Sequence, residues 1–143
     1  MRLIHDMKDF AEPGCVAALG TFDGVHRGHV HLLRECVRLA GEKGVSALAL
    51  TFDRHPLALI APEAAPPALT SLEEKRALIA NLGIETLVEQ PFTREFADLK
   101  PEDFFERLRD ALRPRALVVG FNYTFGRKGS GERRAPAGTE KGL

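Results

Sequence analysis

Short apolar segments alternate along this chain with segments of helical periodicity, and this alternation limits the possible folds more than any other feature. The apolar segments are rich in Val, Leu and Ala, which is typical of strands buried on both faces. They are Val16–Leu19, Val45–Phe52, Thr86–Glu89 and Ala116–Val119. The alternation predicts an α/β fold built on a parallel sheet with helices on both faces.

Three amphipathic helices are predicted between these strands. Their apolar residues recur at helical spacing, and we expect them to pack on the sheet. These residues are Val30, Leu33, Val37 and Ala40 in the first helix, Leu78, Ile79 and Leu82 in the second, and Phe104, Phe105, Leu108 and Leu112 in the third. Ser71 and Glu74 have capping-box spacing before the second helix, and Pro101 suits the start of the third. Gly44 and Gly83 can end the first and second helices.

The composition is that of an ordinary soluble domain. The chain has 143 residues, of which 44% are hydrophobic and 28% charged. No apolar run approaches the roughly 20 residues of a membrane span, and the N-terminal sequence lacks the apolar core of a signal peptide. Only Cys15 and Cys36 are present, so no disulfide framework is expected. These features together predict a cytoplasmic protein.

The charge of the chain is zero overall but uneven along the sequence. Residues 113–143 hold seven Lys or Arg and two Asp or Glu. This basic segment is either a solvated tail or a basic rim for phosphates. Because no periodic apolar face continues beyond Gly126, we expect one domain over residues 1–126 and a mobile tail over 127–143. The zero net charge gives no reason to expect nucleic-acid binding.

The clearest site signal is the ten-residue string GTFDGVHRGH, residues 20–29, between the first apolar strand and the first helix. Its glycines allow a tight turn and a close approach of the backbone to a ligand, and they are Gly20, Gly24 and Gly28. The start of the following helix suits a polyphosphate. His26 and His29, three residues apart, are expected to face the same phosphate-binding mouth.

The string H-x-G-H after a first strand resembles the nucleotidyltransferase superfamily. The longer string narrows the resemblance to the FMN adenylyltransferase (FAD synthetase) module of bacterial bifunctional riboflavin kinase/FMN adenylyltransferases. Three further segments are similar to that family, in the same order, and the resemblance extends to about Gly131. They are Thr51–Pro56, Leu69–Lys75 and Val118–Gly126.

This resemblance implies a Rossmann-like nucleotidyltransferase fold and the conversion of ATP, supplied with Mg²⁺, and FMN to FAD and pyrophosphate. It implies catalytic roles for His26 and His29, and no residue is assigned as a metal ligand. The residues implied on the nucleotide side are Gly20, Thr21, Phe22, Asp23, Gly24 and Gly28. Those implied on the flavin side are His55, Pro56, Asn122 and Phe125.

Several of these residues also have a purely structural interpretation. His55 could be a turn residue, because Pro56 forces an extended conformation on the residue before it. Asn122 could hydrogen-bond its own backbone in a turn. Asp23 could be an acid that favours the start of the first helix rather than a ligand. The sequence alone leaves these alternatives open.

The chain departs from the family pattern in two ways. It lacks the Ser-Ser-Thr-x-Ile-Arg-like motif that follows in relatives, and it lacks their downstream riboflavin kinase module. We therefore predict adenylation of FMN but not phosphorylation of riboflavin, and we expect the chain to be truncated relative to the family. The missing motif leaves open a non-catalytic fragment that binds nucleotide or flavin. Another H-x-G-H nucleotidyltransferase is the third hypothesis.

Overall fold

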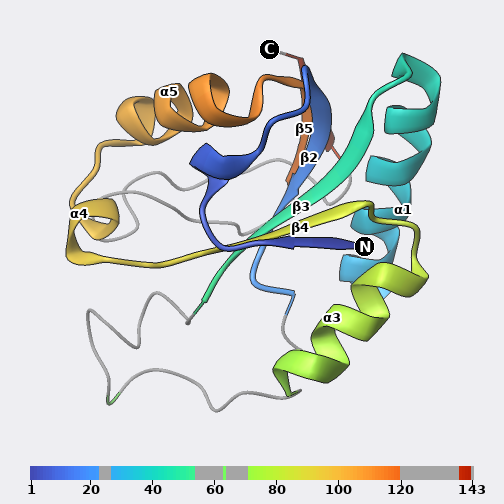
Figure 1. Cartoon of the computed structure of the whole chain (residues 1–143), viewed down its shortest axis with the longest axis horizontal. Coiled ribbons are helices and arrows are strands. Elements are labelled where there is room, and N and C mark those ends of the chain that lie inside the picture. Colours follow the sequence, from blue (N-terminus) through green and yellow to red (C-terminus); the bar gives the residue numbers. More distant parts are fainter. Residues whose placement is uncertain (23–26, 54–62, 64–70, 120–138, 143) are drawn as a thin grey trace.

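The computed structural model describes residues 1–22, 27–53, 63, 71–119 and 139–142. Within these residues, six strands form one sheet in the order β1-β4-β3-β2-β5-β6 (Figure 1). Strands β1 to β5 pair in parallel, and β6 pairs antiparallel to β5. The strands are β1 (Arg2–Ile4), β2 (Cys15–Leu19), β3 (Ser46–Phe52), β4 (Thr86–Gln90), β5 (Pro114–Val119) and β6 (Thr139–Gly142). The predicted α/β fold with a parallel sheet is confirmed.

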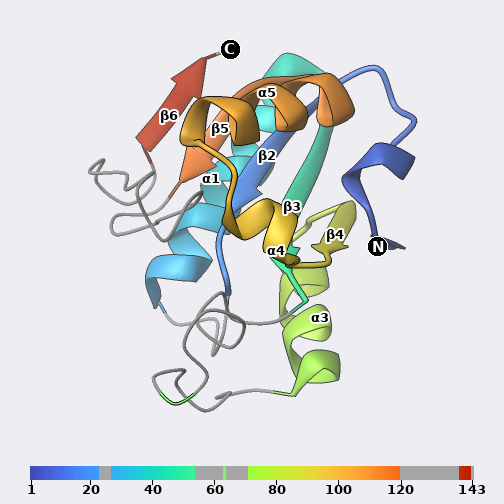
Figure 2. The same cartoon turned by 90° about the vertical axis from the view of Figure 1, so that its left-hand side faces the viewer.

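Helices cover both faces of the sheet, as Figures 1 and 2 show. On one face lie α1 (Arg27–Lys43) and α3 (Leu72–Asn81). On the other lie the short 3-10 helix η1 (Met7–Asp9), α4 (Arg94–Ala97) and α5 (Pro101–Leu112). No helix among the described residues is long and apolar enough to cross a membrane.

The side chains of β2 alternate between two hydrophobic clusters, one on each face of the sheet. Ala17 and Leu19 pack with α5 in the first cluster. Val16 and Ala18 pack with α1 in the second. All five residues of β2 are buried, because parallel strands covered on both faces have no solvent-facing side.

The predicted helix ends are confirmed. Ser71 and Glu74 form a reciprocal capping box: the Glu74 N–H donates to Ser71 Oγ at 3.1 Å, and the Ser71 N–H donates to Glu74 Oε1 at 3.2 Å. Gly44 and Gly83 follow α1 and α3 with φ of +67° and +99°, a left-handed conformation that most side chains disfavour. Pro101 occupies the start of α5.

The apolar face predicted for α3 is wrong at Leu78, because this residue is 41% exposed. Within this helix only Ile79 is buried. The helix therefore lies on the rim of the sheet, where one side chain reaches the core. In α1 the prediction holds at Leu33 and Ala40, which are buried.

Two edge strands were not predicted. β1 lies at the N-terminus, and β6 lies inside the segment expected to be a tail. Residues 139–142 are therefore paired with the sheet. Backbone hydrogen bonds alone can recruit an edge strand, so it needs no alternation of apolar side chains in its sequence.

Both cysteines are free and buried, as small hydrophobic residues would be. The Cys36 thiol donates to the carbonyl oxygen of Val16 at 3.2 Å, and the Cys15 thiol donates to that of Leu112 at 3.4 Å. Burial raises the pKa of each thiol to about 12. Both are therefore protonated and unreactive in the folded protein at neutral pH.

Leu108 and Leu78 offer a matched test of this packing. Leu108 lies in α5 and is fully buried, so Leu108→Ala should lower the free energy of unfolding by about 2–5 kcal/mol. Leu78→Ala removes the same atoms from an exposed position and should change it by less than about 0.5 kcal/mol. Urea denaturation of both variants measures the difference. Equal losses of unfolding free energy in the two variants would contradict the placement of α3.

Candidate active site at the carboxyl edge of the sheet

The winding of the sheet reverses at β2. The chain passes from β2 to β3 and β4 on one side, then returns to place β5 on the other side of β2. In open parallel sheets, ligands bind at the carboxyl ends of the strands where this reversal occurs. The motif that begins at Gly20 directly follows β2, and the family-like segment Val118–Gly126 begins with the last two residues of β5. The described starts of both motifs therefore lie on the two strands that flank this reversal.

The chain leaves β2 through a tight turn at Gly20 and Phe22. The Gly20 N–H donates to the Leu50 carbonyl oxygen at 3.2 Å, which ties the turn to β3. Phe22 is fully buried with φ of +54°. This left-handed conformation costs a non-glycine residue about 1–3 kcal/mol, so the surrounding contacts must hold it. A Cβ on Gly20 would lie 3.0 Å from the Phe22 ring, so any larger residue here would require this ring to shift.

His29 lies in the first turn of α1, beside this turn. Its imidazole meets the Phe22 ring edge-to-face, with ring centroids 5.5 Å apart and planes at 76°. The first turn of α1 carries no acidic side chain. Because the start of a helix carries a partial positive charge, this arrangement favours an anion such as a phosphate near His29.

Two other elements reach the same turn through one carbonyl oxygen. The Thr51 hydroxyl of β3 donates to the Thr21 carbonyl oxygen at 3.2 Å. The Lys75 ammonium of α3 donates to the same oxygen, also at 3.2 Å. The turn after β2 is thus connected to the end of β3 and to α3.

Asp53 joins the ends of β3 and β4. Its N–H donates to the Gln90 carbonyl oxygen at 2.9 Å, and its Oδ1 accepts from the Phe92 N–H at 3.1 Å. Asp53 belongs to the family-like segment Thr51–Pro56, whose His55 and Pro56 lie outside the described residues. The described part of that segment therefore lies at the same edge as the turn after β2.

The structure describes five of the predicted site residues: Gly20, Thr21, Phe22, Gly28 and His29. It brings them together at the carboxyl edge of the sheet. The others lie outside the described residues, and they are Asp23, Gly24, His26, His55, Pro56, Asn122 and Phe125.

Sequence reasoning missed Thr51 and Lys75 as contacts of the site. Both belong to family-like segments, but the sequence pattern assigns neither residue a role. One signal was available, because a lysine near a helix N-terminus is electrostatically unfavourable there and so calls for another explanation.

An ion pair between half-buried Arg76 and buried Glu89 attaches α3 to β4. Arg76 donates to both carboxylate oxygens of Glu89, at 2.8 and 2.7 Å. The Glu89 side chain is only 4% exposed. The hydrogen bonds to this carboxylate raise the pKa of Arg76. Such a pair fixes the position of α3 against β4, because removing Arg76 would leave the Glu89 charge buried and uncompensated.

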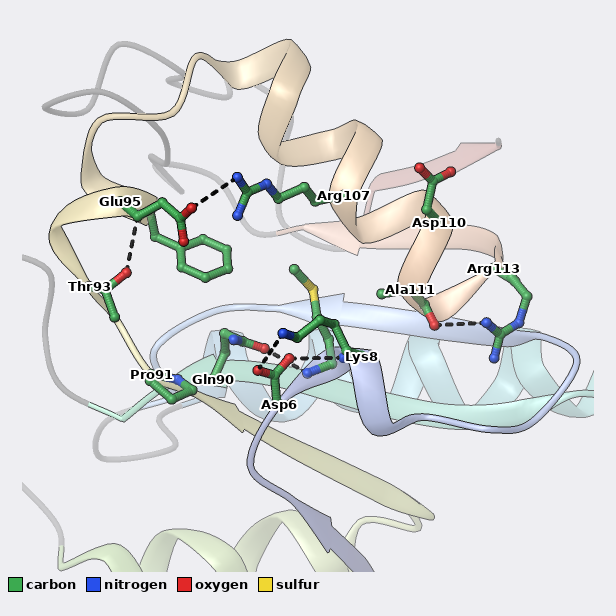
Figure 3. A pocket seen from close by; sticks show the side chains of 12 residues that line it. Asp6, Lys8, Gln90, Pro91, Thr93, Glu95, Arg107, Asp110, Ala111 and Arg113 are labelled. Atoms are coloured by element: carbon green, nitrogen blue, oxygen red, sulfur yellow. Dashed lines mark hydrogen bonds and ion pairs between the residues drawn. The ribbon is translucent and has the colours of Figure 1, made fainter.

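A groove of about 610 Å³ lies elsewhere, between η1, the start of the β4–α4 connection and α5 (Figure 3). None of the predicted site residues lines it. Charged side chains at its rim pair with each other, as Lys8 does with Asp6 at 3.8 Å and Arg107 with Glu95 at 3.4 Å. Its Arg113 donates to the Phe10 carbonyl oxygen at 2.8 Å. The Arg107–Glu95 pair thus joins α5 to α4, and the Arg113 contact joins the residue after α5 to the residue after η1.

No group of three or more His, Cys, Asp or Glu side chains in the described part of the chain could hold a metal ion.

A family model described as FAD synthetase matches residues 8–141, nearly the whole chain. The chain belongs to the FAD synthetase family. The match includes the turn after β2 and the start of α1, and it continues past Gly126 into β6.

Curated relatives of the chain carry the name bifunctional riboflavin kinase/FMN adenylyltransferase. The relative from Listeria monocytogenes is 38% identical over 82% of this chain and 38% of its own length. The one from Escherichia coli K12 is 35% identical over 88% of this chain and 41% of its own length. The one from Bacillus subtilis is 38% identical over 81% of this chain and 37% of its own length. The chain thus spans about two fifths of these relatives.

A solved structure described as macrolide-efflux protein from Streptococcus pneumoniae has a similar fold. Its TM-score to this chain is 0.77, at 30% sequence identity, over 93% of this chain and 45% of that chain. The similarity covers nearly all of this chain and supports the α/β fold.

Gly20 and Gly41 provide a matched test of the turn. Gly20→Ala places a methyl group 3.0–3.1 Å from the buried Phe22 ring and should lower the free energy of unfolding by about 1–3 kcal/mol. Gly41 lies in α1 with no atom within 4 Å of an added Cβ. Gly41→Ala should therefore raise stability by up to about 1 kcal/mol. Thermal unfolding of both variants measures the two effects. A neutral Gly20→Ala would show that the Phe22 ring can move.

Proposed function

We propose that this chain transfers the AMP group of ATP to FMN and releases FAD and pyrophosphate. One phosphate oxygen of FMN would attack the α-phosphorus of ATP. The bond from that phosphorus to the bridging oxygen of the β-phosphate would break in line, and pyrophosphate would leave. No covalent intermediate with the protein is needed, and Mg²⁺ would enter with the ATP phosphates.

The observation that carries this proposal is the position of His29 within a chain of the FAD synthetase family. His29 lies in the first turn of α1, against the buried Phe22, at the edge where the sheet reverses. The transition state of nucleotidyl transfer spreads negative charge over the reacting phosphate oxygens, so positioned donors provide most of the catalysis. A helix start with an imidazole beside it supplies such donors.

Each predicted site residue has a role in this proposal. His26 and His29 would donate to the phosphates and stabilise the charge that develops on them. The turn and helix start would form the nucleotide side, through Gly20, Thr21, Phe22, Asp23, Gly24 and Gly28. The segments after β3 and β5 would form the flavin side, through His55, Pro56, Asn122 and Phe125. We also propose a cytoplasmic location, which the two free cysteines support.

Incubation of the purified chain with ATP, Mg²⁺ and FMN should yield FAD and pyrophosphate in equal amounts. Riboflavin with ATP should yield no FMN, because the FAD synthetase match accounts for residues 8–141 of the chain. Chromatography of the flavins and a pyrophosphate assay measure both reactions. Pantetheine phosphate replaces FMN as a control for substrate class.

Three results would lead to different conclusions. Adenylation of pantetheine phosphate but not FMN would assign the chain to another class of nucleotidyltransferase. FMN or ATP binding without turnover would favour the non-catalytic fragment, since the Ser/Arg motif of relatives is missing from this sequence. FMN formation from riboflavin would refute the limitation to adenylation.

His29→Ala should lower kcat by about 10²–10³-fold while the KM for ATP changes much less. The reason is that a donor directed at developing charge stabilises the transition state more than bound ATP. His29→Asn should retain more activity than His29→Ala because the amide can still donate a hydrogen bond. Steady-state kinetics with ATP varied at saturating FMN measure both parameters.

His31 is the matched control, because it is exposed on the same helix, two residues further along. His31→Ala should keep both kcat and KM close to those of the unmodified chain. A higher KM with unchanged kcat for His29→Ala would contradict a role in the transition state.

A further inference from the structure

The carbonyl oxygen of Thr21 is a meeting point of three elements. It belongs to the turn after β2, and it accepts from Thr51 of β3 and Lys75 of α3, each at 3.2 Å. Thr51 is 1% exposed and Lys75 is half-buried. These donors come from positions 30 and 54 residues away in sequence. Such convergence on one backbone oxygen calls for a physical reason.

That reason lies in the next residue. The Thr21 carbonyl oxygen and the Phe22 nitrogen belong to the same peptide plane. Phe22 has the left-handed φ of +54°, which an L-residue adopts only when its surroundings hold it. Two donors on the oxygen fix the orientation of this plane and so oppose its rotation to an ordinary conformation. The position of the Phe22 ring against His29 then depends on those two hydrogen bonds.

The Lys75 side chain reaches out of α3 to the turn after β2. It lies near the N-terminus of α3, where the helix dipole disfavours a positive charge. The attachment of α3 to the sheet is provided by Ile79, which is buried, and by the ion pair of Arg76 with Glu89. Neighbouring residues of α3 thus have separate contacts: Arg76 reaches β4, whereas Lys75 reaches the turn after β2.

We propose that Lys75 is a positioning residue of the adenylyltransferase site. Its ammonium group holds the peptide between Thr21 and Phe22, and through the Phe22 ring it sets the orientation of the His29 imidazole. The effect of Lys75 on catalysis rests on the proposed function. The effect of Lys75 on the Phe22 and His29 rings is independent of that function.

Lys75→Met removes the ammonium group and keeps most of the length of the side chain. It should lower kcat roughly tenfold, as expected for the loss of one charge-assisted hydrogen bond, with a smaller change in the KM for ATP. Lys75→Arg retains a donor and should recover part of the activity. In the ligand-free chain, Lys75→Met should shift the carbon–proton NMR signals of the His29 and Phe22 rings.

Arg76→Met is the matched control, since it loosens α3 from β4 without removing a contact of the turn. It should lower the melting temperature but leave the His29 and Phe22 signals in place. Thr51→Val removes the other donor to the Thr21 oxygen and should shift the same signals as Lys75→Met. Should Lys75→Met fail to fold, Thr51→Val and Lys75→Arg still test whether the donors to the Thr21 oxygen position the two rings.

Unchanged ring signals in both Lys75→Met and Thr51→Val would overturn the proposal, as would identical effects of Lys75→Met and Arg76→Met on kcat and on the spectra. Shifted ring signals in a chain that makes no FAD would support the positioning role and refute the proposed function. The NMR and kinetic results therefore separate the two proposals.

Discussion

Strand β2 hydrogen-bonds in parallel to β3 on one side and to β5 on the other, and all five of its residues are buried. The placement of the candidate site depends on this double pairing. Because β3 and β5 lie on opposite sides of β2, the winding of the sheet reverses there, and open parallel sheets bind their ligands at the carboxyl ends beside such a reversal. The GTFDGVHRGH string begins where β2 ends.

The turn after β2 contains a residue in a strained conformation that its neighbours hold in place. Phe22 adopts a left-handed conformation in a fully buried position, and Gly20 leaves space for its ring. Hydrogen bonds from Thr51 and Lys75 hold the preceding carbonyl oxygen. A residue in a costly conformation that its neighbours hold in place is typical of functional sites, where preorganisation matters more than local stability. In this chain it orients a histidine at the start of α1.

Much of the fold could be predicted because its signals are local. The four central strands contain short apolar runs of Val, Leu and Ala, and the capping box of α3 lies within four residues. Local signals did not predict the exposure of Leu78. Its helical spacing is correct, but α3 lies on the rim of the sheet and leaves the residue exposed. The pairing of β6 was not predictable either, since backbone hydrogen bonds to β5 require no pattern in the side chains.

By itself, the sequence determined the α/β class, the glycine-rich turn before the first helix, and the resemblance that the family match to residues 8–141 confirmed. Only the tertiary structure decided that Thr51 and Lys75 meet at the Thr21 oxygen and that the Phe22 ring packs against His29. The physical reason is the range of the interactions. Periodicity and capping depend on residues a few positions apart, whereas contacts across 30 and 54 residues depend on the order and register of the strands.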